Sequence, residues 1–374
     1  MSKLWMLLFL AMLLSFAVSH RDRRLHRNGD QRHRYDKVFT IALVLLLGGF
    51  CGLRTFYNDT ITYIQIYERA PLLSDFYKIN SATYAYGIGF AYLNSLIKTL
   101  GFSTQDYLMF YSMITTACYV RFVRKHTNNF PLSVFLMFTT GFYTFAFAAI
   151  KQCMATAVCL FGLEFLLEGK KSIYIFFVLL ASLFHPYALV YLLLLLMDFR
   201  PLTRKTYLYI GIFIAVGFGL NSIIGTIVDI TTMIGASYNM ASFVGEGVNI
   251  FRVLVSFVPL ALAFLFGRNM FTHSTSEENV LFNMAMLNAL IMFVGLFGTA
   301  NYFARLANYF LPAQVVVLPW MLSRIVRRDR QLLAVLCVAG YTGYFMYGNL
   351  VQSVFDNCFS KITFWHYISS HLGA

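Results

Sequence analysis

Apolar segments long enough to cross a lipid bilayer follow one another along almost all of this 374-residue chain. Hydrophobic residues make up 59% of the sequence and charged residues only 12%, whereas a soluble chain typically carries about 25% charged residues. A soluble enzyme is therefore excluded. Because a helix satisfies its own backbone inside a bilayer and needs about 20 apolar residues to cross it, we expect an all-α, polytopic integral membrane protein.

The pattern predicts about twelve transmembrane helices, some of them short or broken. The apolar segments are 3–19, 38–53, 104–120, 131–148, 152–167, 172–184, 187–198, 207–228, 250–267, 279–298, 309–323 and 331–350. No small-x-small cleavage pattern follows the first of them, so we expect an uncleaved signal-anchor helix. We detect no internal repeat and no soluble domain, and residues 1–374 are expected to form a single integral membrane domain.

The basic residues predict the orientation of these helices, because cytoplasmic loops retain Lys and Arg. The loops assigned to the cytoplasm are 20–37, 121–130, 168–171, 199–206, 268–278 and 324–330. They hold 20 of the 29 Lys and Arg residues. The net charge of +13 is therefore mostly an orientation signal, and no nucleic-acid partner is expected.

Two segments decide this topology. Residues 84–100 could cross the membrane, but a crossing there would export the basic loop 121–130, so we expect an amphipathic helix in the outer interface. The apolar stretch 172–199 contains His185 followed by Pro186. Proline lacks an amide donor and disfavours helix at the residue before it. We therefore expect a helix break at His185, which then faces the outer side.

Ionisable residues at the outer ends of these helices are costly in a membrane and are functional candidates. They fall into four clusters: Arg54 with Asp59 and Tyr63; Lys151 with Gln152; His185; and Arg305 with Asn301 and Tyr309. The cations can bind a phosphate, Arg through a planar fork. Asp59 and His185 can take or give a proton, and the tyrosines can stack on sugar rings. This inventory indicates chemistry on a lipid-linked, phosphate-bearing sugar.

Each candidate also has a purely structural interpretation. The three cations lie where interfacial anchors are common, Asp59 could cap a helix, and His185 could satisfy a carbonyl freed at the helix break. The six cysteines show no metal-binding spacing, and we expect no metal and no cofactor.

The four clusters, in this order, resemble the EpsG-type family of bacterial exopolysaccharide polymerases, which is related in role to Wzy polymerases. The matching pieces lie between about residues 38 and 325 and are Arg54, Asp59 and Tyr63; Tyr86–Phe90 with Leu93 and Asn94; Lys151, Gln152 and Ala155; Ala181, Phe184, His185, Ala188 and Leu189; and Arg305, Leu306, Tyr309 and Phe310. Two positions depart from the family pattern, since Lys151 stands where the family usually has Arg and Gly87 where we expect an acidic residue.

The resemblance implies a membrane glycosyltransferase that polymerises repeat units into exopolysaccharide, capsule or O-antigen, without a nucleotide sugar. The units are polyprenyl-diphosphate-linked oligosaccharides, joined on the outer face of the bacterial cytoplasmic membrane, with a chain-length regulator and a flippase as candidate partners. On this hypothesis Arg305, Arg54 and Lys151 hold the diphosphate. His185 or Asp59 orients or deprotonates the acceptor hydroxyl. Further substrate contacts are expected from Gln152, Tyr63, Asn301 and Tyr309.

Other function classes stay open. A lipid-linked oligosaccharide flippase also needs many helices and cations, but it is expected to place charge in a central cavity and often has two related halves. A polysaccharide ligase or an acyltransferase would differ in its product, because it joins the sugar to another acceptor or adds an acyl group.

Overall fold

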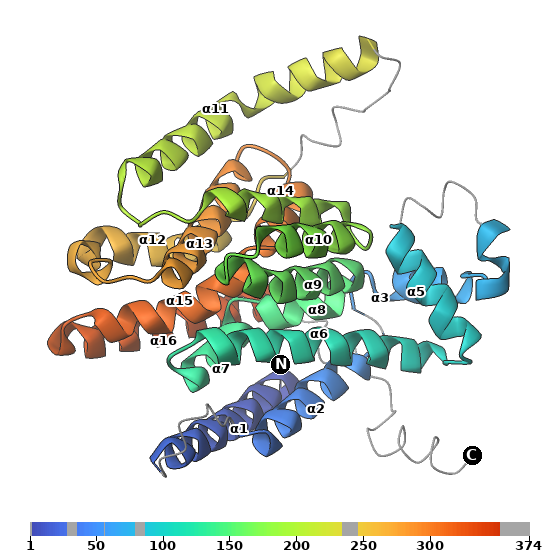
Figure 1. Ribbon diagram of the computed structural model, residues 1–374, viewed down its shortest axis with the longest axis horizontal. Coiled ribbons are helices and arrows are strands. Elements are labelled where there is room, and N and C mark those ends of the chain that lie inside the picture. The colour runs from blue at the N-terminus through green and yellow to red at the C-terminus, as the bar shows by residue number, and fades with distance from the viewer. Residues whose placement is uncertain (1, 28–35, 56, 79–86, 234–245, 352–374) are drawn as a thin grey trace. The chain divides into compact units, whose positions relative to one another are not determined.

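A computed structural model describes residues 2–27, 36–55, 57–78, 87–233 and 246–351, and it contains helices and no strands in these ranges (Figure 1). The chain divides into two compact units. The first comprises residues 1–189 and 345–374, and the second comprises residues 190–344. The all-α membrane fold expected from the sequence is confirmed.

The first unit is organised around one long helix, α6. Its helices are α1 (Ser2–Arg27), α2 (Val38–Gly52), α3 (Thr60–Glu68), η1 (Leu73–Lys78), α5 (Ile88–Thr99), α6 (Thr104–His126), α7 (Phe130–Thr139), α8 (Phe142–Ala148), α9 (Ile150–Leu167) and α10 (Lys171–Ser182). Helix α6 packs against α2 and α9, and α9 packs against α10 (Figure 1). A Cβ at Gly52 would lie 2.8 Å from the Cα of Met109. The glycine therefore lets α2 approach α6 closely.

The second unit is organised around α13. Its helices are η2 (Pro186–Leu196), which begins in the first unit, α11 (Arg204–Met233), α12 (Ile250–Met270), α13 (Ser276–Val294), α14 (Ala300–Asn308), α15 (Leu311–Arg324) and α16 (Arg327–Val351), which ends in the first unit. Helix α13 packs against α11, α12, α14 and α15. Every residue from Val280 to Met292 is buried, as expected of a helix that is apolar around its whole circumference. Only Asn283 and Asn288 are polar in this stretch.

Four helices of the described residues are long and apolar enough to cross a membrane, or up to six if each of two bent pairs counts as one span. One bent pair is α7 with α8, which meet at 45° next to Gly141, a glycine in the left-handed conformation with φ of 83°. The apolar segments 38–53, 172–184 and 187–198 coincide with the shorter helices α2, α10 and η2, and those at 104–120, 207–228 and 331–350 lie in α6, α11 and α16. The count of about twelve crossings stays a prediction. The break expected at His185 is confirmed, because α10 ends at Ser182 and η2 begins at Pro186.

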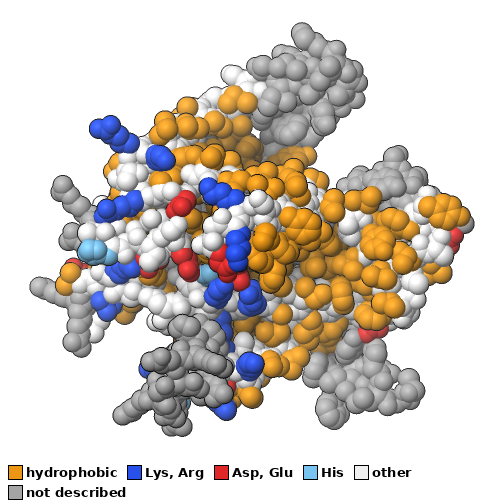
Figure 2. Space-filling model, in the orientation of Figure 1, with side chains coloured by type: hydrophobic (Ala, Val, Ile, Leu, Met, Phe, Trp, Pro, Cys, Tyr) orange, Lys and Arg blue, Asp and Glu red, His pale blue; other side chains and the backbone are white. Residues whose placement is uncertain are grey.

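The surface has the composition that a lipid environment requires. On the face that Figure 2 shows, hydrophobic side chains cover large continuous areas. Large apolar side chains such as Phe218 and Leu265 are 72% and 73% exposed. An exposed apolar surface of this kind is typical of helices that face lipid.

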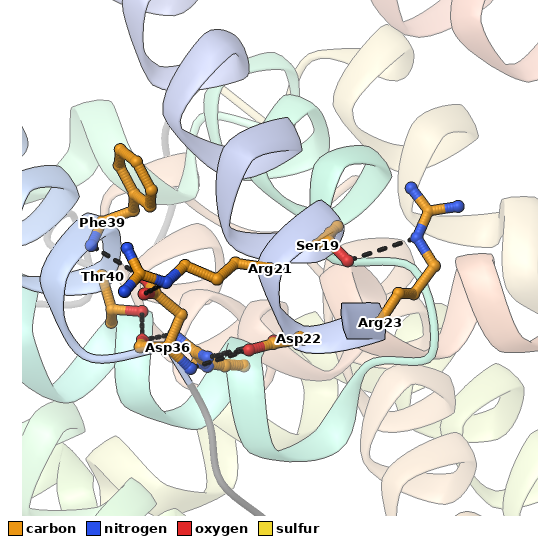
Figure 3. A network of polar contacts seen from close by, with 8 residues as sticks. Ser19, Arg21, Asp22, Arg23, Asp36, Phe39 and Thr40 are labelled. Atoms are coloured by element: carbon orange, nitrogen blue, oxygen red, sulfur yellow. Dashed lines mark hydrogen bonds and ion pairs between the residues drawn. The ribbon is translucent and has the colours of Figure 1, made fainter. Parts of the chain in front are cut away.

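At one end of the first unit, the buried carboxylate of Asp36 and the partly buried carboxylate of Asp22 join α1, α2 and α6 (Figure 3). Asp36 accepts a hydrogen bond from the backbone N–H of Phe39 at 2.7 Å and lies 3.2 Å from Nε of Arg21. Its own backbone N–H donates to Asp22 at 2.7 Å. Arg124 of α6 donates to the Asp36 carbonyl at 2.6 Å and pairs with Asp22 at 2.8 Å. The side chains of Arg124 and Asp36 are 8% and 2% exposed, whereas that of Arg21 is 51% exposed, so the network is buried on its α6 side and open to solvent at Arg21.

The same end of the first unit carries a second ion-pair group. Arg121 and Lys125 of α6 both pair with Glu164 of α9, and Lys125 Nζ lies 2.9 Å from the carboxylate. Together the two networks bring the ends of α1, α6 and α9 to one place. These helix ends border the loops 20–37, 121–130 and 168–171, which the sequence assigns to one side of the membrane.

The second unit gathers its predicted cytoplasmic loops in the same way. Ser276 donates a hydrogen bond to Asp198 at 2.7 Å. Arg324 donates to the Met270 carbonyl at 2.9 Å and pairs with Glu278 at 2.8 Å. The loops 199–206, 268–278 and 324–330 therefore meet at one end of this unit. That this end faces the cytoplasm stays a prediction.

We expect the substitution Arg124→Gln to destabilise the protein by roughly 2–4 kcal/mol, because removing one partner of a buried ion pair leaves a carboxylate uncompensated. The measurement is the thermal midpoint of the detergent-solubilised protein. Lys170→Gln is the matched control, since the Lys170–Glu168 pair is about half exposed on both sides and its loss should leave the midpoint unchanged. Equal midpoints for the two variants would show that the network in Figure 3 adds nothing to stability.

Candidate functional site

Four of the five segments that carry the family resemblance meet at one hydrophobic cluster of the first unit, and the segment around Arg305 does not belong to this unit. The buried members of the cluster are Tyr63 and Tyr67 of α3, Phe90 and Ile97 of α5, Tyr107, Leu108 and Tyr111 of α6, and Ile150 of α9. Phe184 packs against this cluster. Because Ile150 directly precedes Lys151 and Phe184 directly precedes His185, the cluster draws the start of α9 and the end of α10 toward α3 and α5.

Arg54 is fully buried, at 0% exposure, beside this cluster. Its Nη1 donates to the carbonyl of Cys51 at 2.7 Å and to the Ser112 hydroxyl at 3.0 Å, and its Nε donates to Thr60 Oγ1 at 3.2 Å. All three acceptors are neutral. The Nη2 atom is buried and has no hydrogen-bond partner among the described residues. This is not the exposure of an interfacial anchor, and it places a positive charge in a surrounding of low polarity.

Thr60 connects Arg54 to the junction between α8 and α9. Its hydroxyl lies 2.7 Å from the Tyr57 carbonyl and 3.2 Å from the Phe147 carbonyl, near the end of α8. The Arg54 guanidinium also lies 5.8 Å from the centre of the Phe147 ring. Arg54 is therefore held beside the point where α9 begins.

Helix α9 begins at this junction without a side-chain N-cap, because the capping position is Ala149. Lys151 in its first turn is half-buried, and Gln152 is 1% exposed. The N-terminus of a helix carries a partial positive charge and free amide donors. Together with the Lys151 ammonium, this start of α9 favours an anion such as a phosphate.

Asp59 occupies the N-cap position of α3, but its side chain makes no capping hydrogen bond. The capping role considered for it is therefore not realised in this structure. The residue is half-buried and lies in the short connection between Arg54 and Tyr63. Its carboxylate stays a candidate proton acceptor.

His185 lies in the break between α10 and η2 and is 7% exposed. Its ring meets the Tyr187 ring edge to face, with centroids 4.9 Å apart. The segment before it is fixed by α5, because the backbone N–H of Gly89 donates to the Leu183 carbonyl at 2.9 Å. The helix break thus has a backbone donor that replaces part of the lost helical bonding.

The close approach of α5 to this break explains why a glycine stands at position 87. Gly87 has φ of 95°, a conformation that L side chains rarely adopt, and a Cβ there would lie 2.6 Å from the Phe184 carbonyl oxygen. An acidic side chain at Gly87 is therefore excluded in this packing.

Tyr63 is 5% exposed, and its ring meets Phe90 edge to face at 5.9 Å. In this structure the ring packs inside the cluster. The neighbouring Tyr67 stacks on Tyr107 at 4.3 Å and donates its hydroxyl to the Phe102 carbonyl at 2.7 Å. Burial raises the pKa of Tyr67, and the Asp106 carboxylate raises it further. Tyr67 is therefore a hydrogen-bond donor and stays protonated.

Helix α5 covers Ile88–Thr99 of the amphipathic helix expected over 84–100, while residues 79–86 lie outside the described residues. It buries Phe90 and Asn94, whereas Tyr92 is 48% exposed. Its C-terminal part is tied to α3 through Lys98, whose ammonium donates to two carbonyls at the end of α3, each at 2.6 Å. Its placement in the membrane interface stays a prediction.

The fourth predicted cluster belongs to the second unit. Arg305 is half-buried in α14, and Tyr309 is fully buried directly after this helix. Asn301 also lies in α14, but its side chain lies outside the described residues. Arg305 is therefore placed within the second unit, next to the junction of α14 and α15.

Sequence reasoning missed several buried polar residues that shape these sites. Ser112 and Thr60 bind Arg54, and Asn288 of α13 donates to the Ala307 carbonyl at 2.7 Å. Their common signal was available: each is a polar residue in or beside an apolar helix, which membrane helices keep mainly where it finds a partner. Among the described residues, no group of three His, Cys, Asp or Glu side chains could hold a metal ion.

A family model described as the EpsG family matches residues 37–369, nearly the whole chain. The match includes all four predicted clusters and confirms the resemblance seen in their residues. Searches of curated proteins and of solved structures found no significant match.

We expect Arg54→Lys to lower stability by roughly 2–4 kcal/mol, because the ammonium stays buried and cannot reproduce the three directed hydrogen bonds. The thermal midpoint in detergent measures this loss. The control is Arg69→Lys, an exposed arginine at the end of α3 whose replacement should change stability by less than about 0.5 kcal/mol. A midpoint of Arg54→Lys equal to that of the control would contradict the binding described above.

We expect Gly87→Ala to destabilise the protein more than Gly101→Ala. Both glycines have positive φ, 95° and 81°, so both variants are strained. Gly87 is strained more, because its ψ of 123° lies outside the left-handed helical region. A Cβ at Gly101 meets nothing within 4 Å, whereas the Cβ at Gly87 meets the Phe184 carbonyl. The difference in thermal midpoint between the two variants reports this clash together with the additional strain, and no difference would mean that α5 does not rest on the break at His185.

Proposed function

Because this chain belongs to the EpsG family, we infer that it joins oligosaccharide repeat units into an exopolysaccharide at a membrane. Family membership supports a function of the exopolysaccharide-polymerase type, and the apolar helices make the chain an integral membrane protein. The finer proposal is that the repeat units are carried on polyprenyl diphosphate. They are joined on the outer face of the bacterial cytoplasmic membrane.

The observation that carries this proposal is the concentration of positive charge at the start of α9. Lys151 and the uncapped helix N-terminus present positive charge there, and the buried Arg54 lies beside the same junction. Arg54 has no exposed surface, so it acts on a bound anion without direct contact. It stabilises the anion by electrostatic attraction, which is strong where water is excluded. Lys151 is half-buried and can contact the anion. A diphosphate fits this arrangement of charge.

The reaction replaces one bond with another at the anomeric carbon of the donor. The acceptor hydroxyl attacks this carbon, the new glycosidic bond forms, and the bond to the diphosphate oxygen breaks with inversion. Lys151 stabilises the negative charge that develops on the leaving diphosphate, which is also the role that the sequence predicts for Arg305. His185 or Asp59 takes the proton of the acceptor hydroxyl. The leaving group is the polyprenyl diphosphate itself, so no nucleotide sugar is needed.

Four further residues are proposed to contact the substrate. Tyr63 and Gln152 are buried in the first unit, and Tyr309 is buried in the second unit. Asn301, in the same helix as Arg305, is a further candidate contact to the sugar.

The test uses purified protein in lipid nanodiscs with its polyprenyl-diphosphate-linked repeat unit, and product length is read on a gel. The wild type should give a ladder of lengths. Arg305→Lys, Lys151→Ala and His185→Ala should each lower the initial rate by about 100-fold, the usual cost of removing one group that stabilises a transition state. Arg69→Ala and His273→Ala remove exposed residues outside the site and should leave the rate unchanged.

Three other results would overturn the proposal. Folded wild-type protein that leaves a verified substrate unextended would do so. Movement of the substrate across the bilayer without covalent change would identify a flippase. Transfer of the sugar to another acceptor, or addition of an acyl group, would identify a ligase or an acyltransferase.

A further inference from the structure

The second unit contains a sharp bend directly after Arg305. Helices α14 and α15 meet at 51°, and Pro312 in the first turn of α15 has no N–H to donate. The Ala313 N–H donates to the Phe310 carbonyl at 3.2 Å, three residues back. In a continuous helix it would donate to Tyr309, four residues back. The bend therefore removes helical donors from the carbonyls around it.

Two buried side chains supply donors at this bend. Asn288 of α13 donates through Nδ2 to the Ala307 carbonyl, and the Tyr191 hydroxyl of η2 donates to the Tyr309 carbonyl, both at 2.7 Å. Both side chains are 0% exposed. The Tyr191 ring also stacks on Phe310, with centroids 5.5 Å apart. The bend is thus held from two different helices.

Burial of the Asn288 amide inside an apolar helix is energetically unfavourable. Its Oδ1 atom is buried and has no hydrogen-bond partner among the described residues, so only its donor side is used. A half-satisfied amide in an apolar helix costs free energy. Asn283, five residues earlier on α13, is half-satisfied in the same way: it donates to the carbonyls of Met197 and Phe199 at 2.7 Å, and its Oδ1 atom also has no partner among the described residues. The two asparagines differ in what they hold, because only Asn288 reaches the bend after Arg305.

We propose that Asn288 and Tyr191 are positioning residues for Arg305. By holding the carbonyls of Ala307 and Tyr309, they fix the direction of α14 and with it the guanidinium of Arg305. Arg305 lies two residues before Ala307, which is less than one helical turn. A displacement of the bend therefore moves the guanidinium. The inference rests on the proposed function in assigning Arg305 to the leaving diphosphate.

The variants remove one donor group each and keep the branching or the ring of the side chain. Asn288→Leu and Tyr191→Phe delete the bonds to the bend. The matched controls are Asn283→Leu, which makes the same change and deletes equally buried bonds five residues earlier on α13, and Tyr341→Phe, which deletes a buried hydroxyl in the same unit that lies 3.3 Å from the Val255 carbonyl. Thermal midpoints in detergent establish that the paired variants are folded to the same extent.

The kinetic readout is the polymerisation rate with the lipid-linked repeat unit. Asn288→Leu and Tyr191→Phe should lower kcat by about 10- to 100-fold at nearly unchanged KM, because a small misplacement of a catalytic group costs rate more than ground-state binding. In the Arg305→Ala background the same substitutions should have almost no further effect, since they act through Arg305. Wild-type kcat, equal losses in the controls, or full additivity with Arg305→Ala would overturn the proposal.

A second readout does not depend on polymerisation. Arg305→Cys is labelled with a polar, membrane-impermeant maleimide, and the unsubstituted chain gives the background from its own cysteines. Asn288→Leu should change the labelling rate of position 305 by about 5-fold or more, while Asn283→Leu leaves it unchanged. An unchanged rate in Asn288→Leu overturns the positioning role. A changed rate in a protein that does not polymerise overturns the proposed function alone.

Discussion

The constraint on which the rest of this structure depends is that backbone N–H and C=O groups inside a membrane must find partners within the protein. A continuous helix meets this constraint by itself, and every break violates it locally. The structure repairs its breaks with donors from other elements. Thr60 reaches the Phe147 carbonyl, the Gly89 N–H reaches Leu183, and two side chains hold the bend after α14. Each repair ties a break to a distant part of the chain.

The candidate functional residues lie beside these repaired breaks. Lys151 follows the junction of α8 and α9, His185 lies between α10 and η2, and Arg305 precedes the junction of α14 and α15. A break exposes helix ends, whose partial charges can act on a ligand, and it fixes the side chains next to it. A break destabilises a membrane helix, but it also places partial charges and side chains where they can bind a charged substrate.

Charge is distributed differently at the two ends of α6 and α9. At one end the basic side chains Arg121, Lys125 and Arg124 have carboxylate partners, which are the groups that hold the helix ends together. At the other end Arg54 is bound to neutral acceptors and Lys151 lies at a helix N-terminus. Cations paired with carboxylates stabilise the fold. The charge of a cation bound to neutral acceptors is not compensated, so it can attract an anionic ligand.

The sequence by itself determined the fold class, the break at His185 and the family. These follow from local chemistry: apolar length predicts a membrane helix, a proline ends one, and the order of the four clusters marks the family. It also found the residues beside the breaks, because ionisable groups are conspicuous in an apolar chain. Only the tertiary structure decided that Arg54 is buried, that Gly87 must lack a side chain, and that Asn288 and Tyr191 hold the bend near Arg305. Each of these depends on a partner far away in the chain, and hydropathy, which is a local property, contains no information about such pairs.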